Sequence, residues 1–79
     1  MEIKEKVRGF LGRYLRKYDL KDDEDIFSLG FVNSLFSMQL VMFLEKEFEL
    51  VVDNEDLDLS NFKSIDSITS FVEKKIKNN

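Results

Sequence analysis

Ser34 is the residue of this 79-residue chain whose surroundings best suit covalent chemistry. Gly30 can turn the chain sharply just before it, and the short side chains of Asn33 and Ser34 are of the kind that accept hydrogen bonds from unpaired amides at helix N-termini. Residues 34–48 contain no Gly, no Pro and one β-branched residue, so we expect a helix of about four turns that begins at Ser34. A phosphate ester there would lie at the positive end of the helix dipole, which stabilises negative charge by about 0.3–1 kcal/mol. The alternative is that Ser34 only caps the helix.

Composition excludes several kinds of catalytic and metal site. The chain has no Cys and no His, which rules out thiol catalysis, histidine base catalysis and zinc sites built from these residues. An acidic run at residues 22–25 suggests calcium, but an EF-hand needs Gly at its sixth position, where a loop starting at Asp22 has Phe27. No dedicated metal site is therefore expected.

At this length we expect one domain, residues 1–79, with no deep catalytic cleft, since such a domain buries only about 60% of its unfolded surface.

Charge is distributed unevenly along the chain. The net charge is −4, but residues 1–18 have a balance of +4 and residues 19–66 a balance of −10. An acidic middle disfavours nucleic acid and favours basic protein surfaces as partners. No stretch approaches 18 apolar residues and the start has no hydrophobic signal core, so we expect a cytoplasmic protein without a membrane partner.

Apolar residues at helical spacing predict a first amphipathic helix within residues 1–18. They are Ile3, Val7, Phe10, Leu11, Tyr14, Leu15 and Tyr18. Gly9 and Gly12 lower its intrinsic stability, so this helix should depend on packing against the rest of the chain. A long connection follows at residues 19–33, and its apolar second half, with Ile26, Phe27 and Leu29, should fasten it over the helices.

The second helix is too apolar for a single buried stripe. One face with i, i+4 and i+8 spacing consists of Leu40, Val41, Leu44 and Phe48. Phe36 and Phe43 fall largely off this face, so we expect one or both to be exposed and available for a contact. The alternative, which the pattern leaves open, is that they pack against the preceding loop.

The last third of the chain predicts two more helices. After an acidic turn at residues 53–59, residues 60–63 suit a short helix. Asp66 is placed to cap a last helix. The stripe of that helix consists of Ile65, Ile68, Val72 and Ile76. The fold class we expect is all-α, a bundle of three main helices plus one short helix, with a long first loop.

Residues 29–35, Leu-Gly-Phe-Val-Asn-Ser-Leu, and the apolar run at residues 39–48 resemble the Leu-Gly-x-Asp-Ser-Leu and Glu-Leu pattern of acyl carrier proteins. The resemblance implies an acyl-carrier-type bundle in which Ser34 carries covalent 4'-phosphopantetheine, transferred from coenzyme A by a phosphopantetheinyl transferase. Asn33 stands where the family usually has Asp, which affects any transferase contact that uses that carboxylate.

The resemblance also implies a function. The protein would be a non-catalytic, monomeric carrier that holds an acyl group as a thioester while an acyl-loading enzyme and downstream synthase or tailoring enzymes dock. Residues 33–41 and 56–66 are similar to discrete carriers of polyketide and hybrid peptide–polyketide pathways, which hold glyceryl, hydroxymalonyl or methoxymalonyl units. The alternatives are a carrier of fatty-acid or aminoacyl groups, and an unmodified helical adaptor in which Ser34 is only a cap and Phe36 and Phe43 bind a partner.

In the family the second helix is the usual docking surface and is rich in carboxylates. Here Phe36, Gln39 and Lys46 stand at positions where acidic residues are common, which favours partners chosen partly by apolar contact. The docking residues implied are Asn33, Leu35, Phe36, Met38, Gln39, Glu45, Asp53, Glu55 and Asp56.

Overall fold

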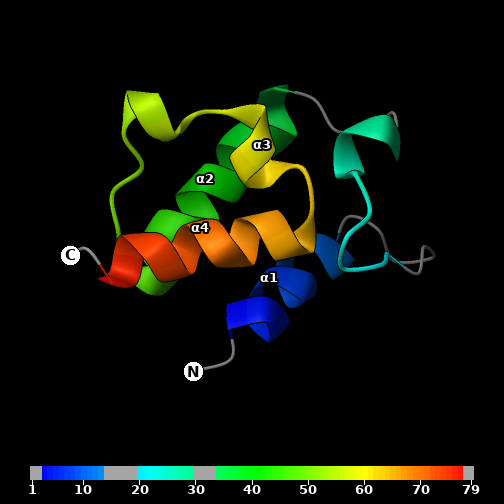
Figure 1. Cartoon of the computed structure of the whole chain (residues 1–79), viewed down its shortest axis with the longest axis horizontal. Coiled ribbons are helices and arrows are strands. Elements are labelled where there is room, and N and C mark those ends of the chain that lie inside the picture. The colour runs from blue at the N-terminus through cyan, green and yellow to red at the C-terminus, as the bar shows by residue number, and fades with distance from the viewer. Residues whose placement is uncertain (1–2, 14–19, 30–33, 78–79) are drawn as a thin grey trace.

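The structure, a computed structural model, describes residues 3–13, 20–29 and 34–77, with the backbone alone at Leu29, Ser34 and Leu59. Its elements are α1 (Ile3–Gly12), the 3-10 turn η1 (Ile26–Leu29), α2 (Ser34–Phe48), the 3-10 turn η2 (Asn54–Asp56), α3 (Leu59–Phe62) and α4 (Ile65–Lys77). Three main helices and one short one confirm the predicted all-α fold, and the described part contains no strand. Figure 1 shows α4 across the front, with α1 below it, α3 above it and α2 behind. No helix of the described part is long and apolar enough to cross a membrane.

Helix α1 (Ile3–Gly12) confirms the first part of the helix that the apolar spacing predicts. It buries Val7, Phe10 and Leu11 and packs against α4. It ends at Gly12, and the Arg13 N–H donates to the Phe10 carbonyl over 3.2 Å, a bond that tightens the last turn. Glycine has poor helix propensity, which accounts for an end at this point. The predicted continuation at Tyr14, Leu15 and Tyr18 lies outside the described residues.

The connection after α1 is fastened to the far end of the chain by its backbone. Ile26 is fully buried, and its N–H donates to the Lys63 carbonyl over 2.7 Å. The Asp66 N–H donates to the Asp22 carbonyl over 2.9 Å, which joins the acidic half of the connection to the first turn of α4. Phe27 packs against the core. These contacts confirm that Ile26 and Phe27 hold the connection on the bundle, whereas the side chain of Leu29, the third residue predicted to do so, lies outside the described part.

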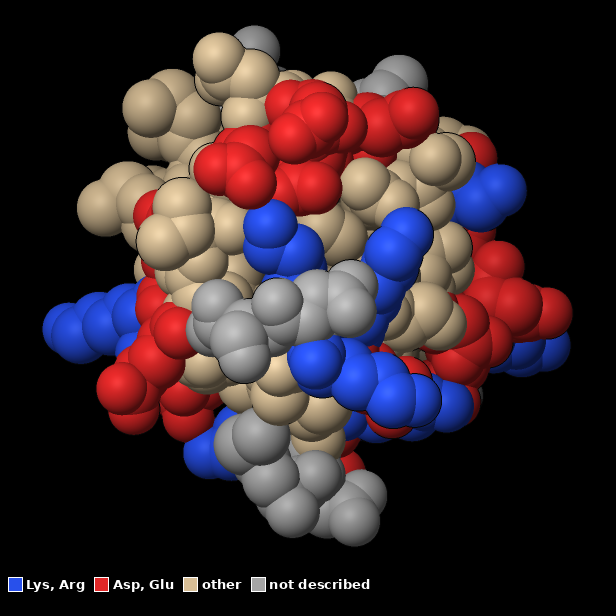
Figure 2. All heavy atoms as spheres, turned by 60° about the vertical axis from the view of Figure 1, so that its left-hand side comes forward, with Lys and Arg blue, Asp and Glu red and all other residues tan. Residues whose placement is uncertain are grey.

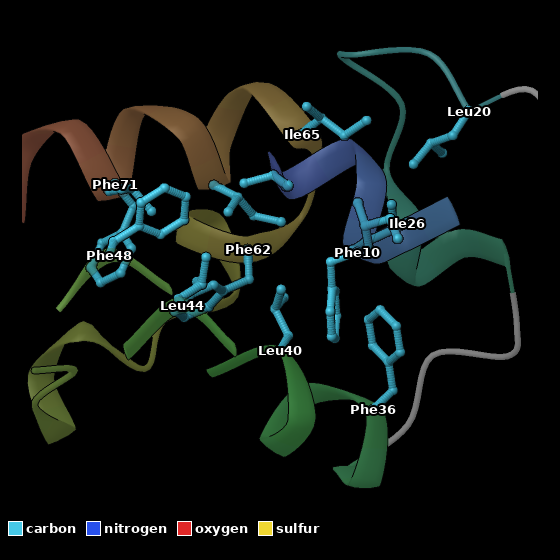
Figure 3. Close-up of a cluster of buried hydrophobic side chains, with 14 of the residues drawn as sticks. Phe10, Leu20, Ile26, Phe36, Leu40, Leu44, Phe48, Phe62, Ile65 and Phe71 are labelled. Atoms are coloured by element: carbon cyan, nitrogen blue, oxygen red, sulfur yellow. The ribbon is translucent and has the colours of Figure 1, made fainter. Parts of the chain in front are cut away.

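Helix α2 runs from Ser34 to Phe48, as the sequence predicts, but its buried face differs from the expected one. That face consists of Phe36, Leu40, Leu44 and Phe48. The Phe36 ring lies beside Phe10 of α1, with 6.2 Å between ring centroids (Figure 3). Phe43 is half-buried and stacks on Phe10 at 4.5 Å. The expectation that Phe36 is exposed is therefore wrong, because α1 supplies an aromatic partner on that side of α2.

Helices α3 and α4 close the bundle. Helix α3 begins one residue earlier than predicted, and its Phe62 meets Phe71 of α4 edge to face at 5.2 Å. The cap of α4 is Ser64, whose Oγ accepts the Ser67 N–H over 3.1 Å, so the prediction that Asp66 is the cap is wrong and Asp66 lies in the first turn. The predicted stripe is buried except at its end, where Ile76 is 36% exposed.

Candidate functional site

Ser34 is the first residue of α2, so its backbone lies at the positive end of a 15-residue helix. The first turn of this helix contains no acidic side chain, so no carboxylate from the helix itself offsets the free amides there. Such an end suits a phosphate ester, as the sequence predicts. Asn33, the candidate docking residue just before it, lies outside the described residues.

The start of α2 is held in place by its first buried side chains. Phe36, two residues after Ser34, is 7% exposed and contacts the ring of Phe10. Leu40, one turn further, is 2% exposed in the same core (Figure 3). Phe36 therefore fixes the end of α2 that carries Ser34, and it acts from the core rather than as the docking residue the sequence analysis expected.

An apolar stripe runs along the outer face of α2. Leu35 is 64%, Met38 63% and Met42 64% exposed, and their spacing of three and four residues places them in one row that begins beside Ser34. Large apolar side chains exposed side by side on a small domain indicate a contact surface. The sequence analysis predicted Leu35 and Met38 as docking residues but missed Met42, although the three residues have i, i+3, i+7 spacing in the sequence. Gln39, also named, is half-buried beside this row.

Three of the four acidic residues predicted for docking form hydrogen bonds or ion pairs within the protein. Glu45 accepts the Val52 N–H over 2.9 Å. Asp53 and Asp56 both pair with Lys75 of α4, at 3.3 and 2.8 Å, and the hydrogen bond from Lys75 holds the pKa of Asp56 below its ordinary value. Glu55 is exposed and forms no ion pair with a described residue. Figure 2 shows acidic side chains in several groups on this face, the largest at the top of the view, with Lys and Arg side chains close to them.

A small pocket lies one turn after Ser34, which sequence reasoning did not foresee. Its volume is about 130 Å³ and its lining is mainly apolar. It includes Phe27 of η1, Phe36, Ser37 and Leu40 of α2, and Leu57 and Phe62 from the α3 region. Ser37 and the carboxylate of Asp58 contribute polar atoms, and two hydrogen bonds from Ser60 hold the pKa of Asp58 below its ordinary value.

A family model described as the phosphopantetheine attachment site matches residues 2–72. The chain therefore belongs to the phosphopantetheine-binding carrier family, whose members bind 4'-phosphopantetheine covalently. Carriers of this family are generally non-catalytic and work with phosphopantetheinyl transferases and synthase enzymes. This confirms the carrier resemblance. No curated protein matches the chain, and no solved structure does.

Proposed function

We propose that Ser34 is the attachment residue and that the protein is an acyl carrier without catalytic activity of its own. When bound, 4'-phosphopantetheine supplies a thiol that holds the acyl unit as a thioester. The observation that carries the proposal is that α2 begins at Ser34 and has no acidic residue in its first turn, within the span matched by the family model. The free amides of that turn favour the phosphate diester on the serine oxygen.

The chain's own contribution is to present the attachment point rigidly and to offer a surface beside it. Phe36 packs on Phe10 and so fixes the first turn of α2 against α1. Leu35 and Met38 stay exposed next to Ser34, where any enzyme that receives the arm must approach. The partners we propose are a phosphopantetheinyl transferase, an acyl-loading enzyme and a downstream synthase or tailoring enzyme, all acting on a monomeric carrier.

For the cargo we propose a short unit. The pocket near Ser34 is small, with a volume of about 130 Å³. A three-carbon glyceryl, hydroxymalonyl or methoxymalonyl unit is of that size, whereas a long fatty acyl chain is not. Ser37 and the acceptor oxygens of Asp58 suit the hydroxyl groups of a glyceryl unit best, because the negative charge of Asp58 disfavours the carboxylate of a malonyl-type unit. These considerations favour polyketide or hybrid peptide–polyketide biosynthesis.

Intact-mass spectrometry tests the attachment. The full chain is incubated with coenzyme A and a promiscuous phosphopantetheinyl transferase, and the expected product has gained one phosphopantetheine. Ser34→Ala should gain none, whereas Ser37→Ala, the matched change one turn along α2, should be modified like the unchanged chain. Modification of Ser34→Ala would place the arm elsewhere, and an unmodified wild-type chain would favour the helical adaptor.

A further inference from the structure

A shallow hollow of about 600 Å³ lies between α1 and α2, apart from the pocket near Ser34. It is formed by Phe10 of α1, by Arg13 just after this helix, and by Gln39, Met42, Phe43 and Lys46 of α2. Its apolar base is firm, because the rings of Phe10 and Phe43 stack at 4.5 Å with 21° between their planes, and Phe43 also meets Phe48 edge to face. Met42, at 64% exposed, extends this apolar base toward solvent.

The charge around the hollow is opposite to that of the molecule as a whole. Arg13 and Lys46 are both exposed, and neither forms an ion pair with a described residue. The cations within α1 form ion pairs, since Lys4 pairs with Asp22 and Asp66, Lys6 with Glu47, and Arg8 with Asp22. Glu45 also borders the hollow, but its carboxylate accepts the Val52 N–H. The described lining of the hollow therefore has two cations and one carboxylate, a balance of +1, in a chain whose net charge is −4.

From this complementarity we propose that the α1–α2 hollow is a docking site for a protein segment with a large apolar side chain flanked by Asp or Glu. The apolar side chain packs on the exposed Met42 and the half-buried ring of Phe43, which the buried ring of Phe10 supports. The carboxylates pair with Arg13 and Lys46, which excludes basic segments by like-charge repulsion. This surface selects a partner of the opposite charge to the basic partners that the acidic middle of the sequence led us to expect.

Peptide selection with the unmodified full chain tests the proposal, so the result does not depend on whether Ser34 carries an arm. Random peptides displayed on phage are selected for binding, and the bound peptide is then titrated into protein labelled with 13C at its methionine methyl groups. The chain has only Met1, Met38 and Met42, so each methyl signal can be assigned. We expect enriched peptides with Phe, Leu or Trp next to Asp or Glu, and a shift that is largest at the Met42 methyl.

Matched variants separate the hollow from general charge effects. Lys46→Glu should weaken the selected peptide about tenfold or more, as expected for a reversed charge at a contact. Lys63→Glu changes the net charge equally at an exposed residue outside the hollow and should leave the affinity within about twofold. Met42→Glu tests the apolar contact and should abolish peptide binding, which is measured by isothermal titration calorimetry because this variant lacks the Met42 methyl group.

Several outcomes would overturn the proposal. They are enrichment of basic peptides, equal effects of Lys46→Glu and Lys63→Glu on affinity, and binding without a shift at the Met42 methyl group. The proposal also fails if no peptide is selected, or if every selected peptide still binds the Met42→Glu variant. A Met42 signal that shifts with protein concentration alone would mean that a second copy of the chain occupies the hollow.

Discussion

Asp22 and Asp66, far apart in the sequence, are joined both through the backbone and through one lysine. The Asp66 N–H donates to the Asp22 carbonyl over 2.9 Å, and Lys4 Nζ lies 3.3 Å from the carboxylate of Asp22 and 3.1 Å from that of Asp66. Arg8 adds a second ion pair to Asp22 and donates to the Leu20 carbonyl over 2.8 Å. The acidic half of the connection is therefore a joint between α1 and α4 rather than a loose solvated run.

The first prediction concerns this joint. Asp22→Ala removes both cationic contacts while leaving the backbone bond to Asp66, so it should lower the melting temperature and speed amide exchange at Asp66 and Ile26. Asp23→Ala removes the same charge from an exposed neighbour that forms no ion pair with a described residue. Thermal unfolding and hydrogen exchange of both variants check the prediction, and equal behaviour of the two would contradict it.

The second prediction is a pH dependence at η2. The hydrogen bond from Lys75 and the Asp53 backbone N–H hold the pKa of Asp56 below its ordinary 3.8. A lowered carboxyl pKa contributes stability that is present above about pH 4 and is lost as the pH falls through the folded value. Asp56→Asn should therefore reduce the loss of melting temperature between pH 7 and pH 3.

The matched control is Glu55→Gln, since Glu55 is the exposed neighbour in the same turn. It should leave the acid loss of stability as it is in the unchanged chain. An identical acid response in Asp56→Asn and Glu55→Gln would show that the Lys75 pair contributes nothing to stability.

The sequence predicts the outline of the fold because its strongest signals are local. The uninterrupted run at residues 34–48 predicts α2 to the residue, and Ser34 begins it as expected. The Phe36 error was avoidable, because Phe36 lies four residues before Leu40 and so extends the same i, i+4 row. Phe43 is different, since its half-burial depends on stacking with Phe10 of another helix, which no spacing within α2 encodes.

Contacts between distant segments account for most of what the sequence could not give. Lys75 pairs with Asp53 and Asp56, which lie about 20 positions earlier in the sequence. Two carboxylates that the sequence predicts to be available for docking are therefore already in ion pairs within the protein. The cap of α4 shows a local competition, because Ser64 and Asp66 are both good capping types and only the position where the helix starts decides between them. The attachment role of Ser34 and the docking surface stay predictions.

The third prediction separates core from surface on α2. Phe36→Ala should destabilise the protein by about 3–5 kcal/mol, the usual loss for a buried Phe, which is a large share of the stability of so small a domain. Leu35→Ala changes the adjacent exposed residue and should change the free energy of unfolding by less than about 0.5 kcal/mol. Urea unfolding of both measures the difference. If Phe36→Ala is as stable as the unchanged chain, Phe36 is a surface residue and not part of the core.

The last prediction concerns the end of α2, where Glu49 adopts φ 52°. This left-handed conformation just after Phe48, together with the Leu50 N–H donating to the Glu45 carbonyl over 3.3 Å, is a helix end that usually has Gly. This conformation costs a residue with a Cβ about 1–2 kcal/mol of folding free energy. Gly avoids that cost, but the greater conformational entropy of Gly in the unfolded chain offsets about 0.5–1 kcal/mol of the gain. Glu49→Gly should therefore stabilise the protein by about 0.5–1 kcal/mol.

Glu49→Ala is the control for Glu49→Gly, because it removes the same exposed carboxylate but keeps the Cβ and its strain. Its free energy of unfolding should stay within about 0.5 kcal/mol of the unchanged chain. Urea unfolding should thus rank Gly above both Ala and Glu at this position. If Ala stabilises as much as Gly, the gain comes from removing a negative charge near the helix C-terminus, where the dipole already disfavours it, and not from relief of backbone strain.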